Sequence, residues 1–342
     1  MQLAPWKISA EYLSGKVTDV HAHVGVSLKA YASVEYPYAQ SLESLYYRQK
    51  CGGVDLSVVF PFGPELHFDL SELIRRGRMV PAEAPYSEAP YILENRLLLT
   101  ELHCFCPEHR ERFLPFVSVD PVRATARQLE ALGVLGGEYP IYGIKISPVA
   151  CQSRVTGLLA EGESLLDYAE EQDLPVLFHV TVHPQEEFSQ AADTFRVIER
   201  RPSLRFCLAH CIGLHRGFLE QADAMPNVWV DTSALKIQVQ AAYEGAPFMA
   251  GPEDRFDWDY SDHRRVMQSL VERFPDTILW GSDSPYYSFM VERYQGEGSL
   301  LAFAFKGTYE DEVAALRVLP KELQDRVASR NTAAFLFGRG AV

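Results

Sequence analysis

The sequence has no run of basic residues and no long apolar stretch. Among its 342 residues, acidic side chains outnumber basic ones by 46 to 32, which gives a net charge of −14. This charge disfavours binding to nucleic acid or to an anionic membrane surface. A membrane-spanning helix needs roughly 18 consecutive apolar residues, and the sequence contains no such run. We therefore expect a protein that binds neither nucleic acid nor membrane.

Cysteines, targeting signals and nucleotide-binding motifs are also scarce or absent. Six cysteines in a chain of this length do not make the dense pattern of a disulfide-stabilised secreted domain. The N-terminal segment MQLAPWKISAEYLSG lacks the basic region and apolar stretch of a secretory signal, so we expect a cytoplasmic protein with reduced thiols. No Gly-x-Gly-x-x-Gly motif follows a strand and no Walker-type loop is present, which argues against a nucleotide-binding fold.

Eight short apolar runs of strand type are spaced along the chain. They cover residues 17–25, 55–63, 113–121, 141–148, 175–181, 205–213, 228–233 and 277–285. Segments with helical periodicity lie between the later runs, at 164–172, 194–200 and 264–273. This alternation predicts an α/β fold, a (β/α)8 TIM barrel that forms a single domain over residues 1–342. An open, doubly wound sheet has the same local pattern and is the alternative.

Three connections are too long to be simple turns. They cover about residues 27–54, 64–112 and 234–262, and each follows a predicted strand. In a barrel these connections rise over the face that carries catalytic groups, where long loops commonly shape or cover a substrate site. We therefore interpret them as a lid and pocket walls, and not as a second domain. The aromatic residues expected at the mouth are Tyr286, Tyr287 and Phe289.

Side chains of the metal-binding type follow three of the eight runs. They are His21, His23, His179 and Asp283. Residues two apart on a strand share a face, so His21 and His23 point to the same interior. Parallel barrel strands end at one face, which brings the four side chains together. Imidazole and carboxylate ligands favour a divalent ion, with Zn2+ as the first choice and Mn2+ as the alternative.

Each of these residues also has a purely structural interpretation. On their own, His21 and His23 would fit a pair of core histidines with hydrogen-bond partners. Asp283 would fit an acidic N-cap, since the residues after it resemble a helix start. The expected convergence with His179 favours the metal. Asp19, on the same strand face, is better suited to orienting a ligand histidine than to direct ligation.

These motifs together resemble the amidohydrolase superfamily. The pattern consists of Asp19-x-His21-x-His23, His179, His210 and Asp283. The segments GIKISP (143–148), LAHCIG (208–213), GSDSP (281–285), RERFLPFVSVDP (110–121) and RNTAAFLF (330–337) are similar to the amidohydrolase-2 group. This group contains metal-dependent TIM-barrel hydrolases, lactonases and nonoxidative decarboxylases. Single motifs are weak, but their order and spacing span nearly the whole chain.

The resemblance implies roles for two further residues. In two-metal members the histidine at the place of His210 binds a second ion. In one-metal members it lies beside the substrate and donates to the developing oxyanion, which is the role we favour. The resemblance also implies that a lysine at the place of Lys145 can be carboxylated and bridge two metals. An unmodified Lys145 would instead form an ion pair or contact an anionic substrate.

A rival zinc site would combine four residues from the second long connection. These are His103, Cys104, Cys106 and His109. Their spacing does not match the common Cys-x-x-Cys fingers, and the residues before them have the composition of a helix. We interpret the two cysteines as packing residues.

The predicted activity is metal-dependent hydrolysis of a small molecule. The ion held by the four ligands would activate water, and Asp283 would accept the proton as water attacks an ester, lactone or amide carbonyl. His210 or the metal would polarise the carbonyl oxygen. Homo-oligomers formed through the loop insertions are compatible with this function.

Two other function classes stay open on the sequence. The first is nonoxidative decarboxylation of an aromatic or unsaturated acid, which a fixed arginine in the pocket would favour, with Arg48 and Arg154 as the candidates. The second is a metal-free barrel that only binds or scaffolds. In that class, the four clustered side chains of the metal-binding type at the strand ends would have no function.

Overall fold

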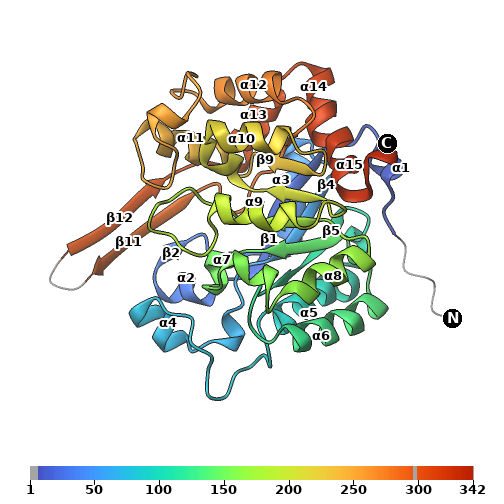
Figure 1. Ribbon diagram of the computed structural model, residues 1–342, viewed down its shortest axis with the longest axis vertical. Coiled ribbons are helices and arrows are strands. Elements are labelled where there is room, and N and C mark those ends of the chain that lie inside the picture. The colour runs from blue at the N-terminus through green and yellow to red at the C-terminus, as the bar shows by residue number, and fades with distance from the viewer. Residues whose placement is uncertain (1–6, 296–298, 342) are drawn as a thin grey trace.

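Eight parallel strands form the centre of the molecule (Figure 1). The computed structural model describes residues 7–295 and 299–341. The strands are β1 (Thr18–Val26), β4 (Leu56–Pro61), β5 (Phe113–Val119), β6 (Gly143–Ile146), β7 (Val176–Phe178), β8 (Phe206–Leu208), β9 (Val228–Asp231) and β10 (Ile278–Leu279). Each predicted apolar run overlaps one of them, so the alternation of strands and helices was interpreted correctly.

The sheet closes between its first and last strands. Each strand pairs in parallel with the next, from β1 through β4 to β10. At the open edge, the His23 backbone amide donates to the Ser284 carbonyl at 2.7 Å, and the Asp283 amide donates to the His21 carbonyl at 2.9 Å. These bonds join β1 to the segment after β10. The predicted TIM barrel is therefore confirmed, and the open sheet is excluded.

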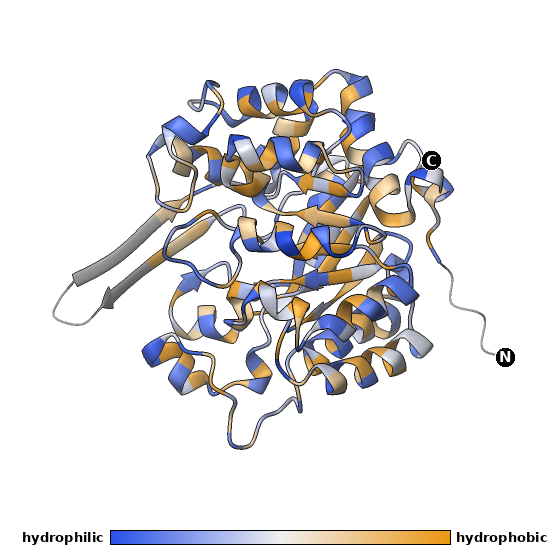
Figure 2. Cartoon of the chain, viewed as in Figure 1, coloured by the Kyte–Doolittle hydropathy of each residue, from blue (hydrophilic) through white to orange (hydrophobic). Residues whose placement is uncertain are grey.

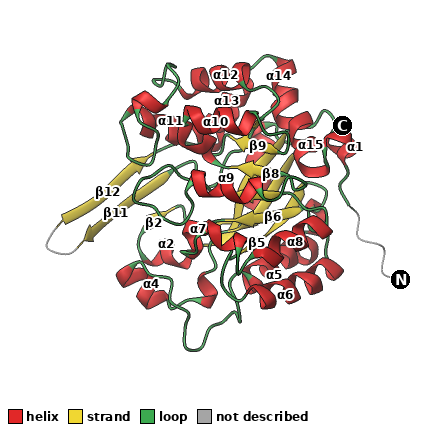
Figure 3. Cartoon of the chain, in the orientation of Figure 1, coloured by secondary structure: helices red, strands yellow, loops and turns green. Residues whose placement is uncertain are grey.

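Helices surround the barrel on its outside (Figure 3). Their bounds are α1 (Ala10–Leu13), α2 (Leu28–Ala32), α3 (Leu42–Gly52), α4 (Leu70–Arg76), α5 (Ile92–Thr100), α6 (Thr125–Glu138), α7 (Pro148–Cys151), α8 (Glu163–Glu171), α9 (Ala191–Glu199), α10 (Arg216–Asp223), α11 (Leu235–Tyr243), α12 (His263–Arg273), α13 (Tyr309–Arg317), α14 (Lys321–Asp325) and α15 (Asn331–Phe337). Among the described residues, no helix is both long and apolar enough to cross a membrane.

Buried residues of the strands and helices form two apolar clusters. Figure 2 shows hydrophobic and hydrophilic residues mixed along the helices that surround the strands. One cluster lies between the strands and the helices, and the other fills the barrel. Phe116 and Trp229 belong to the filling, and Phe335 of α15 packs against both rings. At Gly143, a Cβ atom would come within 2.3 Å of the Phe116 ring. Because side chains fill the lower barrel this tightly, the C-terminal strand ends are left as the place for a cavity.

A projecting hairpin is the one large element that the sequence did not predict. Strands β11 (Phe289–Gln295) and β12 (Ser299–Phe305) pair antiparallel, and β11 also pairs with β2 (Glu35–Tyr36). Figure 1 shows the hairpin extending away from the barrel. A further short strand, β3 (Ala39–Gln40), pairs antiparallel with the end of β1.

Candidate active site

Two histidines of β1 present the same ring nitrogen to one point. His21 Nδ1 lies 2.8 Å from Asp231 Oδ2, and His23 Nδ1 lies 3.3 Å from the Pro61 carbonyl oxygen. Both partners can only accept hydrogen bonds, so each Nδ1 carries the proton. The Nε2 atoms consequently carry the lone pairs that can bind a cation, and the one of His21 also lies 3.3 Å from Lys145 Nζ.

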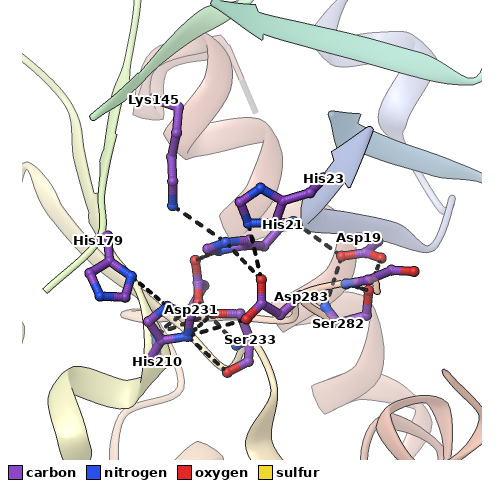
Figure 4. A network of polar contacts seen from close by, with 12 residues as sticks. Asp19, His21, His23, Lys145, His179, His210, Asp231, Ser233, Ser282 and Asp283 are labelled. Atoms are coloured by element: carbon purple, nitrogen blue, oxygen red, sulfur yellow. Dashed lines mark hydrogen bonds and ion pairs between the residues drawn. The ribbon is translucent and has the colours of Figure 1, made fainter. Parts of the chain in front are cut away.

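Asp283 meets these two nitrogens with a carboxylate oxygen. Its Oδ1 lies 3.2 Å from His21 Nε2 and 3.3 Å from His23 Nε2, yet this buried atom accepts no hydrogen bond. Lone pairs on atoms of the buried His21 and Asp283 and of the half-buried His23 thus face one another at short range (Figure 4). Such an arrangement is unfavourable unless a cation lies between them. The donor set therefore fits a divalent metal ion.

His210 completes the cluster from the turn after β8. Its backbone is left-handed, with φ of 60°, and the left-handed conformation continues through Leu214. Ser233 Oγ lies 2.9 Å from His210 Nδ1, and the His210 amide donates to Asp231 Oδ1 at 3.2 Å. These contacts hold a strained turn in place, and such strain is concentrated at functional sites.

The free side of the His210 ring contacts another histidine. His210 Nε2 lies 3.0 Å from His179 Nδ1, and His210 Nδ1 lies 3.7 Å from Asp283 Oδ2. Single ligand atoms of His21, His210 and Asp283 lie within 4.8 Å of one another. His179 therefore joins the cluster through His210, whereas His210 approaches the carboxylate directly.

Lys145 approaches the cluster from β6. Its Nζ lies 3.3 Å from His21 Nε2 and 4.7 Å from the centre of the Phe60 ring. Burial is the main cause that lowers the pKa of Lys145 to about 8. This lysine exchanges its proton more readily than one in water, and its side chain reaches the same point as the two histidines.

Burial also sets the charges of the other groups. It lowers the pKa of His21 to about 4 and lowers the pKa of His23, so both rings are neutral at pH 7. Burial alone would raise the pKa of Asp283, but the surrounding histidines outweigh it and hold that pKa below its usual range. Neutral imidazoles beside an ionised carboxylate are the protonation states that a metal ion requires.

A large cavity opens above the cluster. Its volume is about 940 Å3, and His23, Lys145, His179, His210 and Asp283 line its base. The upper walls come from loops after several strands and carry many aromatic side chains: Tyr36, Phe62, Tyr91, Phe188, Phe248, Tyr286, Phe289 and Phe305. A concave, mostly apolar space with a few polar groups at its base is the usual form of a small-molecule site.

Residues 95–338 match the family model described as amidohydrolase. The chain belongs to the amidohydrolase family. A search of curated proteins finds no match.

Solved structures share the fold of this amidohydrolase at low sequence identity. An amidohydrolase from Burkholderia multivorans is 12% identical with a TM-score of 0.57, covering 96% of this chain and 98% of its own. The 2,6-dihydroxybenzoate decarboxylase from Rhizobium is 13% identical with a TM-score of 0.56, covering 94% and 98%. The 4-oxalomesaconate hydratase from Rhodopseudomonas palustris is 14% identical with a TM-score of 0.52, covering 95% and 97%. At these identities the likeness concerns the fold alone.

The rival zinc site does not assemble in this amidohydrolase. His103 stacks on Tyr139, and His109 stacks on Tyr46 with ring centres 4.2 Å apart. Cys104 is exposed and Cys106 is buried. Among the described residues, the cluster with His21 is the one group whose ligand atoms come close enough for a metal.

Other predicted residues take different places from those expected. Asp19 accepts from the backbone amides of His21 and Ser282, at 3.1 and 2.9 Å, so it does not orient the His21 ring. Asp231 does so instead, and the sequence interpretation missed it. The signal was present, because Asp231 ends a strand at the same level as the other polar residues. Tyr287 is buried away from the cavity, whereas Tyr286 lines it.

Proposed function

We propose that this amidohydrolase is a metal-dependent hydrolase of small esters, lactones or amides. The observation that carries the proposal is the buried Asp283 oxygen that faces two histidine nitrogens without a proton between them. His21, His23 and Asp283 would hold the ion, with His179 or His210 as a further ligand. The imidazole-rich donor set favours Zn2+. A bound divalent ion supplies Lewis acidity, polarising a carbonyl oxygen and lowering the pKa of water.

Asp283 has the properties of the proton acceptor. Its carboxylate is ionised at neutral pH, and it lies at the base of the cavity where the attacking water must enter. The Oδ2 atom lies 3.7 Å from His210 Nδ1, so the histidine pair flanks the carboxylate. A positioned base of this kind contributes roughly 100- to 10,000-fold to the rate.

The member of the His179–His210 pair that does not bind the ion would stabilise the oxygen that becomes negative. Their nitrogens share one hydrogen bond at 3.0 Å, and both residues line the cavity. Ser233 and Asp231 hold the His210 backbone and ring, so the ring does not need to reorganise during the reaction. Donors fixed in advance are the most effective form of electrostatic stabilisation.

Nonoxidative decarboxylation is the alternative, and it receives less support from the cavity. The described residues that line it include no arginine to grip a substrate carboxylate. Of the two candidates, Arg48 donates to Tyr287, and Arg154 pairs with Glu187 with most of its side chain exposed. Two structural relatives, acting on 2,6-dihydroxybenzoate and 5-carboxyvanillate by their names, are decarboxylases. They justify testing the alternative directly.

The test compares both reactions on the metal-loaded protein. Proton release from phenyl acetate, dihydrocoumarin and acetanilide measures hydrolysis, and CO2 release from hydroxybenzoates measures decarboxylation. We expect hydrolysis, which Asp283→Asn lowers at least 100-fold. Asp276→Asn, a surface change with the same chemistry, serves as the matched control and keeps the parent rate. Release of CO2 without hydrolysis would replace the proposal by the alternative.

A further inference from the structure

Carboxylates are more numerous than cations on the cavity walls. The acidic residues that line the cavity are Glu35, Glu65, Glu186, Glu187 and Asp283, and the lysines that line it are Lys29 and Lys145. Lys145 lies at the base against His21 and is not part of the upper wall. Because Glu187 is paired with Arg154, a ligand that extends upward from the base meets chiefly the carboxyl groups of Glu65 and Glu186.

Two of these carboxylates accept hydrogen bonds from neutral groups. Glu65 accepts from Ser27 Oγ at 2.7 Å and from the Lys29 amide at 3.0 Å. Glu186 accepts from the Phe188 amide at 2.8 Å and from both the amide and the hydroxyl of Ser189 at 2.9 Å. Within the described part of the chain, no ion pair involves either residue.

The remaining wall is aromatic and closely packed near the metal ligands. Phe62 and Tyr286 pack against each other with ring centres 5.3 Å apart. Both also contact the His23 ring, at 5.4 and 5.1 Å. Flat apolar faces thus begin immediately beside the reacting end of the cavity, and they suit a planar ring.

We propose that the cavity selects uncharged planar aromatic substrates and rejects those with a negative charge remote from the reacting bond. The proposal rests on the proposed hydrolase function, for which it names aryl esters and aryl lactones as the substrate class. A remote carboxylate would be repelled by the acidic wall and would find no arginine among the described lining residues. An uncharged ring loses nothing to this repulsion and gains contact with the aromatic wall.

Binding of two shape-matched probes tests the proposal without requiring turnover. The probes are 6-(methylsulfonyl)-2-naphthol and 6-hydroxynaphthalene-2-sulfonate, which differ in charge at the end remote from the hydroxyl. A sulfonate is used because it binds metals weakly and so reports on the wall. In titrations of the metal-loaded protein at low salt, we expect the sulfone to bind at least ten-fold more tightly. Added salt should narrow the difference, since exposed charges are screened. Equal or tighter binding of the sulfonate overturns the proposal.

A matched pair of variants locates the effect. Glu186→Gln removes a carboxylate from the cavity wall, and Glu199→Gln removes one from the end of α9, outside the lining residues. We expect Glu186→Gln to narrow the affinity difference between the probes at least three-fold, while Glu199→Gln leaves it at the parent value. The same change in both variants would show that total charge, and not the wall, selects the ligand, which overturns the proposal.

The binding test also separates this inference from the proposed activity. If the sulfone is preferred while esters, lactones and amides stay intact, the selectivity holds and hydrolysis fails. If dihydrocoumarin is hydrolysed while the sulfonate binds as well as the sulfone, hydrolysis holds and the selectivity fails.

Discussion

Asp231 fixes the orientation of the most buried histidine. Its Oδ2 accepts from His21 Nδ1, and its Oδ1 accepts from the His210 amide and from Ser233 Oγ. One carboxylate therefore fixes the orientation of the His21 ring and the position of the His210 backbone. The interaction network around it is drawn in Figure 4.

Replacing Asp231 should weaken metal binding. Asp231→Asn removes the charge that fixes the His21 proton on Nδ1, and we expect roughly 10- to 100-fold lower affinity for Zn2+. Competition with a fluorescent chelator measures the affinity, and circular dichroism checks that the fold is kept. Asp276→Asn is the surface control. Unchanged affinity in Asp231→Asn would mean that the tautomer of His21 is set by other groups.

For individual residues, the sequence was sufficient to predict a contact where strand periodicity alone brings the side chains together. His21 and His23 share a strand face, and Asp283 follows shortly after the last barrel strand, so their approach was expected from the barrel. The contact between His179 and His210 could not be predicted, because it depends on a left-handed turn that begins at His210. Asp19 does not contact the His21 ring, because its carboxylate accepts from the His21 and Ser282 amides and so holds the backbone beside the ring.

At the scale of elements, β1 and the segment after β10 approach closely. Gly281 lies opposite His21, and a Cβ atom there would be 2.9 Å from His21 Cβ. Real Cβ contacts are not this short, so a larger residue would displace β1 or the loop that carries Asp283. Close approach of two backbones is a common reason for glycine.

Gly281→Ala should therefore displace a metal ligand. We expect weaker Zn2+ binding and a loss of about 1–3 kcal/mol in the free energy of unfolding, as for other overpacked cores. Urea unfolding and chelator competition measure the two effects. Gly137→Ala in α6 is the matched control, because a Cβ there meets nothing within 4 Å. A Gly281→Ala protein with parent stability and parent affinity would show that the strands tolerate the added carbon.

The strand–helix units were predictable, but the hairpin was not. Apolar runs of strand length recur through the chain, and each one marks a barrel strand. Strands β11 and β12 pair with each other, and β11 pairs with β2, outside this repeat. Their pairing depends on contacts between distant segments, which local composition does not reveal. For the same reason the walls of the cavity could be assigned to long loops, but their charges could not be placed.

For the whole molecule, one carboxyl group links stability to pH. Burial is the main cause that raises the pKa of Glu94 to about 7 from an ordinary value of 4.5. Its Oε2 atom is buried without a hydrogen bond, while Oε1 accepts from the Leu66 amide at 3.1 Å. Between pH 4.5 and 7 the folded chain binds this proton more strongly than the unfolded chain. Stability consequently falls as the pH rises through that window.

Glu94→Gln should remove this loss of stability. The amide is neutral at every pH. The free energy of unfolding of the variant should therefore rise relative to that of the parent between pH 5 and pH 7, and the difference should persist above pH 7. The gain is about 3 kcal/mol at most, from the size of the pKa shift, less the cost of a buried amide. Urea unfolding at several pH values measures it, with Glu138→Gln as the surface control. A difference that does not change with pH would contradict the assignment.

The metal content of the purified chain tests the central claim most directly. We expect elemental analysis of protein prepared without chelator to find about one divalent ion per chain, lost in His21→Asn and Asp283→Asn and retained in Asp276→Asn. Two ions per chain would keep the metal mechanism but make Lys145 and His210 ligands. No bound ion, even after incubation with zinc or manganese, would contradict the account.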